Sequence, residues 1–223
     1  MRDGFIKVAA VTPDIRVADC EYNAEQICKK MKEAAALGSK IIVFPELCIT
    51  GYTCEDLFWQ EVLLNGAKDA LDQIRKESCE IDALVFVGLP WEWKGKLYNV
   101  AAAICHGRLL GLVPKKNLPN YSEFYEMRHF EPANEELDYI EYPGEEEQEW
   151  IPFGMQQIFY CPQMEGLTVA AEICEDLWVP QPPSITHAIA GANVIVNLSA
   201  SDEITGKDSY RRNLVGGQSA RLV

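Results

Sequence analysis

Short apolar runs alternate along the chain with longer segments of helical spacing. Residues 5–11, 41–44 and 83–89 are runs of strand length in which most positions are apolar. Residues 23–37 carry apolar side chains three or four positions apart, and Gly38 follows as a natural helix stop. The first third of the chain therefore predicts strands separated by an amphipathic helix.

The same alternation continues to the end of the chain. Strands that alternate with helices are typical of an α/β layered fold, and 223 residues suffice for one domain with a sizeable core. The further predicted strands are 101–104, 109–114, 167–173 and 192–198, and the further predicted helices are 58–75, 187–190 and 209–223.

The composition argues against a membrane-spanning or secreted protein. The chain is 48% hydrophobic and 24% charged, an ordinary globular balance, and no stretch approaches the roughly 20 apolar residues that span a bilayer. Residues 1–4 lead into an apolar run without the order of a signal peptide. We expect a cytoplasmic protein with no membrane partner.

The net charge of −14 argues against a nucleic-acid partner, because phosphate binding requires clustered Lys and Arg. The densest acidic stretch is 131–149, and we interpret it as a solvated loop or insertion rather than an interaction surface.

Eight cysteines and three scattered histidines show no close Cys-x-x-Cys spacing. We expect no metal site, and we expect most cysteines to be small buried hydrophobes.

Strongly polar residues follow three of the predicted strands. Glu46 comes after 41–45, Lys115 after 109–114 and Cys174 after 169–173. Each alone has an ordinary explanation, as a helix cap, a solvated lysine or a core cysteine. Rigid strands aim the side chains at their ends, however, so three such residues can form one site.

The three residue types together fit thiol-based amide hydrolysis. A thiol of pKa near 8.5 is mostly protonated at neutral pH, and proton transfer to a Glu of pKa near 4.3 is uphill by about 4 units, roughly 5.7 kcal/mol. Burial would raise the Glu pKa, and a nearby Lys ammonium would favour the thiolate and later an oxyanion. A dry pocket holding all three groups is therefore required.

Seven segments in this order resemble the nitrilase superfamily, and more closely the family of glutaminase domains of glutamine-dependent NAD+ synthetases. The resemblance covers essentially the whole chain. The segments are 44–47 (FPEL), 50–52 (TGY), 56–58 (DLF), 114–121 (PKKNLPNY), 123–126 (EFYE), 172–178 (EICEDLW) and 197–201 (NLSAS).

The resemblance implies a four-layer α-β-β-α sandwich over residues 1–223 that lacks its last strands. It also implies homo-oligomers and a separate ATP-dependent synthetase domain, absent from this chain, in which ATP and Mg²⁺ would act. No cofactor is expected for the glutaminase domain. Residues 216–219 (GGQS) lack the Asp of an ATP-binding loop.

By the same resemblance Cys174 is the nucleophile, Glu46 the general base and acid, and Lys115, rather than its neighbour Lys116, stabilises the oxyanion together with the backbone N–H of Glu175. The resemblance also assigns residues that hold L-glutamine: Tyr121, Phe124, Glu126, Glu175, Ser201 and Lys207. Lys207 stands where some relatives have Arg.

Two further residues have open roles. Glu123 is either a supporting second carboxylate or a solvated loop residue, and Tyr52 matches a residue near the route of ammonia.

The leading hypothesis is a glutamine amidohydrolase domain that supplies ammonia for amidation of deamido-NAD+ to NAD+. The first alternative is a free-standing nitrilase-type amidase or carbamoylase acting on another small amide. A second alternative is a non-catalytic scaffold, which the presence of Glu46, Lys115 and Cys174 disfavours.

Overall fold

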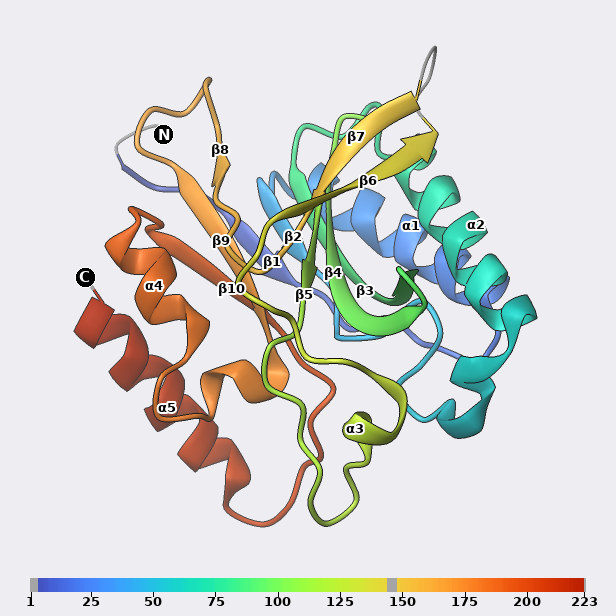
Figure 1. Cartoon of the computed structure of the whole chain (residues 1–223). Helices are drawn as coiled ribbons and strands as arrows, with labels where there is room; N and C mark the ends of the chain where they lie inside the picture. The colour runs from blue at the N-terminus through green and yellow to red at the C-terminus, as the bar shows by residue number, and fades with distance from the viewer. Residues whose placement is uncertain (1–3, 144–147, 223) are drawn as a thin grey trace.

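Two β-sheets lie face to face, and helices cover the outer side of each (Figure 1). The computed structural model describes residues 4–143 and 148–222. The layer order is helix, sheet, sheet, helix, as the sequence predicted.

The first sheet has seven strands in the order β1-β2-β3-β4-β5-β7-β6. β1, β2 and β3 are parallel, and β4 runs antiparallel to both of its neighbours, β3 and β5. β7 is parallel to β5, and β6 pairs antiparallel with β7. The strands are β1 (Val8–Ala10), β2 (Ile41–Val43), β3 (Leu84–Trp93), β4 (Lys96–Cys105), β5 (Arg108–Pro114), β6 (Asp138–Pro143) and β7 (Gln148–Phe153).

Helices α1 (Cys20–Ala36) and α2 (Glu61–Glu77) cover the outer side of this sheet (Figure 1). α1 begins at Asp19, whose side chain accepts a hydrogen bond from the backbone N–H of Tyr22. It ends before Gly38, which has φ +87°. The apolar face of α1 packs against the sheet, and Ala24, Ile27 and Met31 are fully buried there. A short 3₁₀ helix, η1 (Glu55–Trp59), precedes α2.

The second sheet is smaller. It contains β8 (Phe159–Tyr160), β9 (Thr168–Ile173) and β10 (Val194–Leu198), with β9 in the middle and parallel to β10. Helices α4 (Pro183–Ile189) and α5 (Lys207–Leu222) lie on its outer side (Figure 1). The 3₁₀ helix η2 (Cys174–Leu177) follows β9 directly, and α3 (Glu126–His129) is a single turn after β5.

The facing sides of the sheets form one apolar core. Phe86 and Val113 from the first sheet pack in a single buried cluster with Val169, Ala171 and Val196 from the second. Because apolar burial stabilises this contact over its whole area, it fixes where the strands of one sheet end relative to those of the other.

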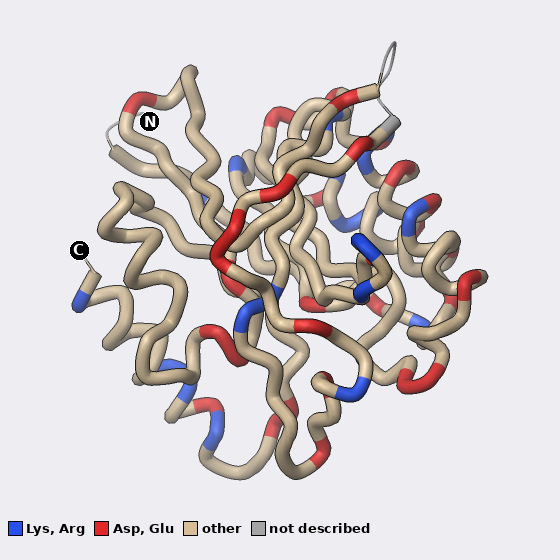
Figure 2. The backbone as a smooth tube through the Cα atoms, viewed as in Figure 1, with Lys and Arg blue, Asp and Glu red and all other residues tan. Residues whose placement is uncertain are grey.

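The acidic stretch differs from the prediction. Residues 138–143 and 148–149, interpreted as loop, belong to the antiparallel pair β6 and β7, while 144–147 lie outside the described residues. Ile140 and Tyr142 are buried while Glu141 between them is exposed. This period-two alternation is a strand signal that the acidic background obscured. Lys and Arg are interspersed among more numerous Asp and Glu along the backbone, and acidic positions follow one another on the segment that leads into β6 (Figure 2).

Five of the eight cysteines are buried, as expected of small hydrophobes, and all eight are free thiols. No helix within the described ranges combines the length and apolar character needed to cross a bilayer. The expected absence of the last strands stays a prediction.

Candidate active site

Glu46 reaches the interior because its backbone lies directly against β3. The segment passes so close to Gly88 that a Cβ there would stand 2.3 Å from the backbone nitrogen of Leu47 and 2.7 Å from the carbonyl oxygen of Pro45. Leu47 itself has φ +50°, a conformation that favours glycine. The side chain of Glu46 is only 2% exposed. The chain therefore turns sharply after β2 and directs this carboxylate between the sheets.

Lys115 follows β5 and has no exposed surface. Its Nζ lies 2.6 Å from Oε1 of Glu46 and 2.7 Å from Oε1 of Glu126. Burial alone would lower the pKa of this ammonium, but the two carboxylates outweigh that effect and raise it above its ordinary value. Lys115 is thus a permanent positive charge in a dry site, whereas Lys116 is partly exposed and pairs with Glu135.

Cys174 occupies the turn between β9 and η2 with φ +44°. Such a backbone conformation is uncommon for a residue with a side chain, and it turns the thiol out of the strand. The Ser199 hydroxyl donates a hydrogen bond of 3.3 Å to Sγ. Burial, followed by the charge of Glu46, raises the thiol pKa to about 12, while Lys115 and Ser199 act in the opposite direction. The resting cysteine is therefore a thiol at neutral pH.

The carboxylate of Glu46 is held by three donors. Oε1 accepts from Nδ2 of Asn99 at 2.7 Å and from Lys115, and Oε2 accepts from the backbone N–H of Ala200 at 3.1 Å. These donors come from β4, from the residue after β5 and from the segment after β10, so both sheets orient this one side chain.

Glu126 is the second carboxylate of the site. Its Oε1 accepts hydrogen bonds from Lys115 and from the Tyr52 hydroxyl, the latter at 2.7 Å. Burial and the charge of Glu46 raise its pKa above the usual range. Glu123, the sequence candidate for a second carboxylate, is exposed. The helical turn of α3 therefore directs Glu126, not Glu123, to the lysine.

The remaining predicted residues surround the mouth of the site. The Tyr121 hydroxyl donates to the Glu175 carboxylate at 3.0 Å, and the ring of Phe124 packs edge-on against those of Tyr121 and Tyr52. Ser201 lies on the half-buried segment after Ala200.

Lys207 begins α5, forms an ion pair with Asp202, and stands over the rings of Phe124 and Trp178, 6.0 and 5.5 Å from their centroids. Its positive charge thus reaches the site already paired with a carboxylate, which the sequence prediction did not include.

The structure adds Asn99, Ser199 and Asp202 to the predicted set. Two of them lie in parts of the sequence that carried a signal. Ser199 belongs to the segment 197–201 (NLSAS), and Asn99 precedes the apolar residues 100–104 of β4. A polar amide within a run of Val and Ala is unusual in a buried strand, and this signal could have revealed Asn99.

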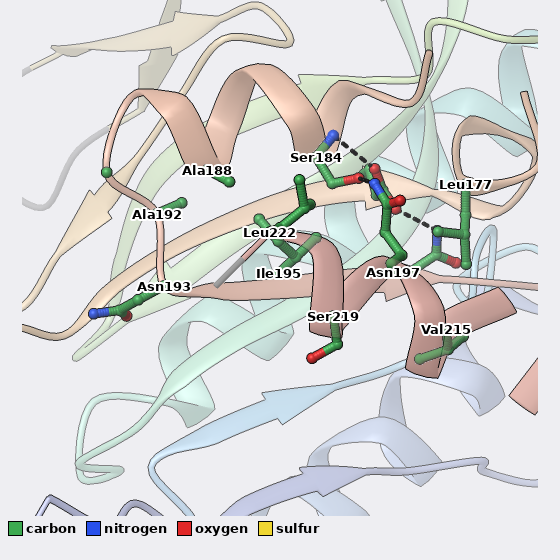
Figure 3. A pocket seen from close by; sticks show the side chains of 13 residues that line it. Leu177, Ser184, Ala188, Ala192, Asn193, Ile195, Asn197, Val215, Ser219 and Leu222 are labelled. Atoms are coloured by element: carbon green, nitrogen blue, oxygen red, sulfur yellow. Dashed lines mark hydrogen bonds between the residues drawn. The ribbon is translucent and has the colours of Figure 1, made fainter. Parts of the chain in front are cut away.

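No group of three or more His, Cys, Asp or Glu side chains within the described residues is arranged to hold a metal ion. A separate cavity of about 550 Å³ lies between α4, α5 and the outer face of the second sheet (Figure 3). On its floor Glu172 accepts hydrogen bonds from the backbone N–H of Ser184 at 3.0 Å and from Asn197 at 3.4 Å. It contains none of the three strand-end residues.

Comparisons with known proteins identify the family of this chain. The model of the carbon-nitrogen hydrolase family matches residues 7–213. A glutamine-dependent NAD(+) synthetase of Mycobacterium bovis is 38% identical over 220 residues, which are 99% of this chain and 32% of that protein. The chain thus spans about a third of the length of this curated relative.

Solved structures show the same fold. A glutamine-dependent NAD(+) synthetase from Cytophaga hutchinsonii superposes with a TM-score of 0.82 at 29% identity, covering 97% of this chain and 34% of that one. An amidase from Nesterenkonia sp. superposes with a TM-score of 0.72 at 17% identity, covering 97% of this chain and 72% of the amidase. The nitrilase-type architecture predicted from the sequence is therefore confirmed.

Proposed function

This chain belongs to the carbon-nitrogen hydrolase family, and we propose that it hydrolyses the side-chain amide of L-glutamine through a thioester on Cys174. The observation that carries the proposal is the fully buried ammonium of Lys115, which lies between the carboxylates of Glu46 and Glu126 in the site that contains Cys174. A buried cation of this kind is suited to an oxyanion that develops during acyl transfer.

The reaction divides into two halves with balanced proton transfers. Glu46 takes the thiol proton as Sγ of Cys174 attacks the carboxamide carbon, and the resulting oxyanion lies against Lys115. When the C–N bond breaks, Glu46 returns that proton to the leaving nitrogen, which departs as ammonia. Water then attacks the thioester with Glu46 again as base, and glutamate and the free thiol are released.

The thiol pKa of about 12 explains why the base and the cation are both needed. At neutral pH the thiolate is a small minority, so deprotonation must be coupled to attack. Lys115 lowers the free energy of the anionic sulfur and then of the anionic oxygen, and Ser199 contributes a hydrogen bond to the former.

Glutamine is favoured over other amides by the charged groups at the mouth of the site. An α-amino acid presents both an ammonium and a carboxylate, and the mouth offers carboxylates on Glu175 and Asp202 and the ammonium of Lys207. A plain amide carries no charges that could interact with these groups. The 38% identity to the Mycobacterium bovis synthetase also favours glutamine, and the free-standing amidase is the weaker alternative because its solved structure shares the fold at 17% identity.

We propose further that the released ammonia serves a synthetase domain that amidates deamido-NAD+ to NAD+, with ATP and Mg²⁺ bound by that domain. The names of the relatives, of which this chain spans about a third, support this assignment. The expected homo-oligomer and cytoplasmic location stay predictions.

The direct test is intact-protein mass spectrometry after incubation with diazo-oxo-norleucine, an electrophilic glutamine analogue. We expect one adduct on the wild type and on Cys79→Ala, a control at an exposed cysteine, and no adduct on Cys174→Ala. Labelling that persists in Cys174→Ala would refute the assignment of Cys174 as the nucleophile. If the wild type turns over other small amides but neither reacts with the analogue nor hydrolyses glutamine, the assignment of glutamine as the substrate would be refuted.

A further inference from the structure

Lys115 and Cys174 reach the site on different sheets. Lys115 follows β5 of the seven-stranded sheet, and Cys174 follows β9 of the three-stranded sheet. The apolar core between the sheets is non-directional, so it does not set the separation of two side chains to a fraction of an ångström. Some directional contact near the site is needed to do so.

Asp176 supplies such a contact. It lies in η2, is 2% exposed, and uses both carboxylate oxygens. Oδ1 accepts from the backbone N–H and from Nδ2 of Asn117, both at 2.8 Å, and Oδ2 accepts from the backbone N–H of Ile173 at 3.0 Å. The carboxylate of Asp176 therefore binds Ile173, which precedes Cys174, and Asn117, which lies two positions after Lys115.

The bond to Ile173 also closes the turn that contains Cys174. Because Cys174 has φ +44°, this turn is strained, and surrounding contacts must hold it in place. Three N–H donors converge on the buried carboxylate, and only a group with two acceptor oxygens can satisfy all three without placing a donor against a donor.

We infer that Asp176 is a positioning residue that holds the Cys174 turn at a fixed distance from Lys115 by binding Asn117. It touches no reacting atom, and it acts through the two segments that it joins. The inference rests on the proposed roles of Lys115 and Cys174, but it does not depend on glutamine as the substrate.

The consequence is electrostatic and can be measured on the resting protein. The groups that act on the pKa of the Cys174 thiol include Glu46, Lys115, the Ser199 hydroxyl and the backbone N–H of Ala200. The hydroxyls of Tyr52 and Tyr121 also lie within electrostatic reach of Cys174. Lys115 is the only cation of this set, and it lowers the thiol pKa. If the Cys174 turn moves away from Lys115, less thiolate is present at any given pH, and a neutral electrophile reacts more slowly.

The test is the rate of Cys174 alkylation by iodoacetamide between pH 6 and 9, followed by mass spectrometry. In Asp176→Asn an amide donor must face one of the three N–H groups. Loss of the Asp176 charge by itself would favour the thiolate, so slower alkylation can arise only if the Cys174 turn is displaced from Lys115. We expect the displacement to dominate and to make the reaction roughly tenfold slower at pH 8, a shift of the profile by about one pH unit. Asn117→Asp places a second carboxylate against Asp176 and should also be slower. The double variant Asp176→Asn/Asn117→Asp restores one amide–carboxylate bond and should recover part of the rate.

Asp72→Asn is the matched control, because Asp72 accepts two hydrogen bonds from Arg75 on α2, outside the site. It should lower the melting temperature and leave the alkylation profile unchanged. An unchanged profile in Asp176→Asn, whatever its melting temperature, would overturn the inference.

If Asp176→Asn does not fold, Asn117→Ala removes only the side-chain donor and should slow alkylation about threefold; no slowing there would equally overturn the inference. Iodoacetamide does not mimic glutamine, so these alkylation rates do not depend on which amide is the substrate. A failure of the glutamine assignment can therefore be distinguished from a failure of the inference about Asp176.

Discussion

The ammonium of Lys115 lies 2.7 Å from Oε1 of Glu126, which stands only 11 residues later in the chain. The same ammonium contacts Glu46, 69 residues earlier. One cation is thus shared by two buried carboxylates, one local and one distant. The ionisation state of the site is shared among three side chains, and changing any one of them changes the other two.

Replacing Glu126 by Gln tests the local carboxylate. The amide keeps the shape of the side chain and an acceptor oxygen for Lys115. It removes one negative charge, however, so that Glu46 is then the only carboxylate that contacts Lys115. We expect kcat to fall about 10- to 100-fold with a cooperative unfolding transition retained. Glu123→Gln is the control, since Glu123 is exposed and should keep full activity. Equal kcat in both variants would contradict the assignment of Glu126.

Replacing Lys115 by Met leaves two buried carboxylates without their cation. Breaking a buried ion pair in this way costs about 3–5 kcal/mol in the free energy of unfolding. The loss should depend on pH. Burial already raises the pKa of Glu126 in the folded protein, and removing Lys115 raises it further.

A folded-state pKa above the unfolded value stabilises the protein below the unfolded pKa, and this stabilisation is lost as pH rises through the folded pKa. Urea unfolding at pH 5.5 and 8 should therefore show the larger deficit of Lys115→Met at pH 8. If Lys115→Met loses the same free energy of unfolding at pH 5.5 and at pH 8, Glu126 does not take up a proton when Lys115 is removed.

Removing the Ser199 hydroxyl should raise the pKa of the Cys174 thiol further, because the thiolate loses a hydrogen bond. A higher thiol pKa means less thiolate at pH 8, so we predict that iodoacetamide alkylation of Ser199→Ala is about three- to tenfold slower. Ser201→Ala is the neighbouring control and should react at the wild-type rate with this electrophile. Faster alkylation of Ser199→Ala would contradict the expected sign.

Lys207 can be tested by its effect on substrate preference. In Lys207→Met the mouth keeps the carboxylates of Asp202 and Glu175 but loses its cation. KM for glutamine should rise about tenfold, while kcat/KM for an amide without an α-carboxylate should change little. Lys116→Met serves as the control for loss of one surface charge. Parallel losses for both amides would place Lys207 outside substrate recognition.

Gly88 sets the close approach of the Glu46 segment to β3. A Cβ at this position would meet backbone atoms of Pro45 and Leu47 below 3 Å, so Gly88→Ala should lower the free energy of unfolding by more than about 2 kcal/mol and displace Glu46. Gly216→Ala is a control that should change stability in the opposite direction. Gly216 lies in α5, and a Cβ at this position would have no atom within 4 Å. Because alanine favours the helix more than glycine does, the change should stabilise α5 by about 0.5–1 kcal/mol. Circular dichroism during thermal unfolding would compare the two.

Much of this protein could be predicted from the order of its residues. Periodicity predicts the other strands of the two sheets but not β6, β7 or β8. It does so because a buried strand and an amphipathic helix each impose a local pattern on the sequence. Glu46, Lys115 and Cys174 were candidates because each follows a predicted strand. The structure brings Glu46 and Lys115 into contact in a site that Cys174 shares. These are short-range properties, and a sequence records them directly.

The tertiary structure decided what depends on contacts between distant segments. Whether Glu123 or Glu126 meets Lys115 depends on the turn of α3 and on Tyr52, 74 residues before Glu126. The hydrogen bonds of Asn99 to Glu46 and of Asp176 to Asn117 join different strands or different sheets. The packing of the two apolar sheet faces brings these segments near one another, and the hydrogen bonds then set the distances between the side chains. The sequence determined which groups could react, and the folded chain alone determined which of them meet.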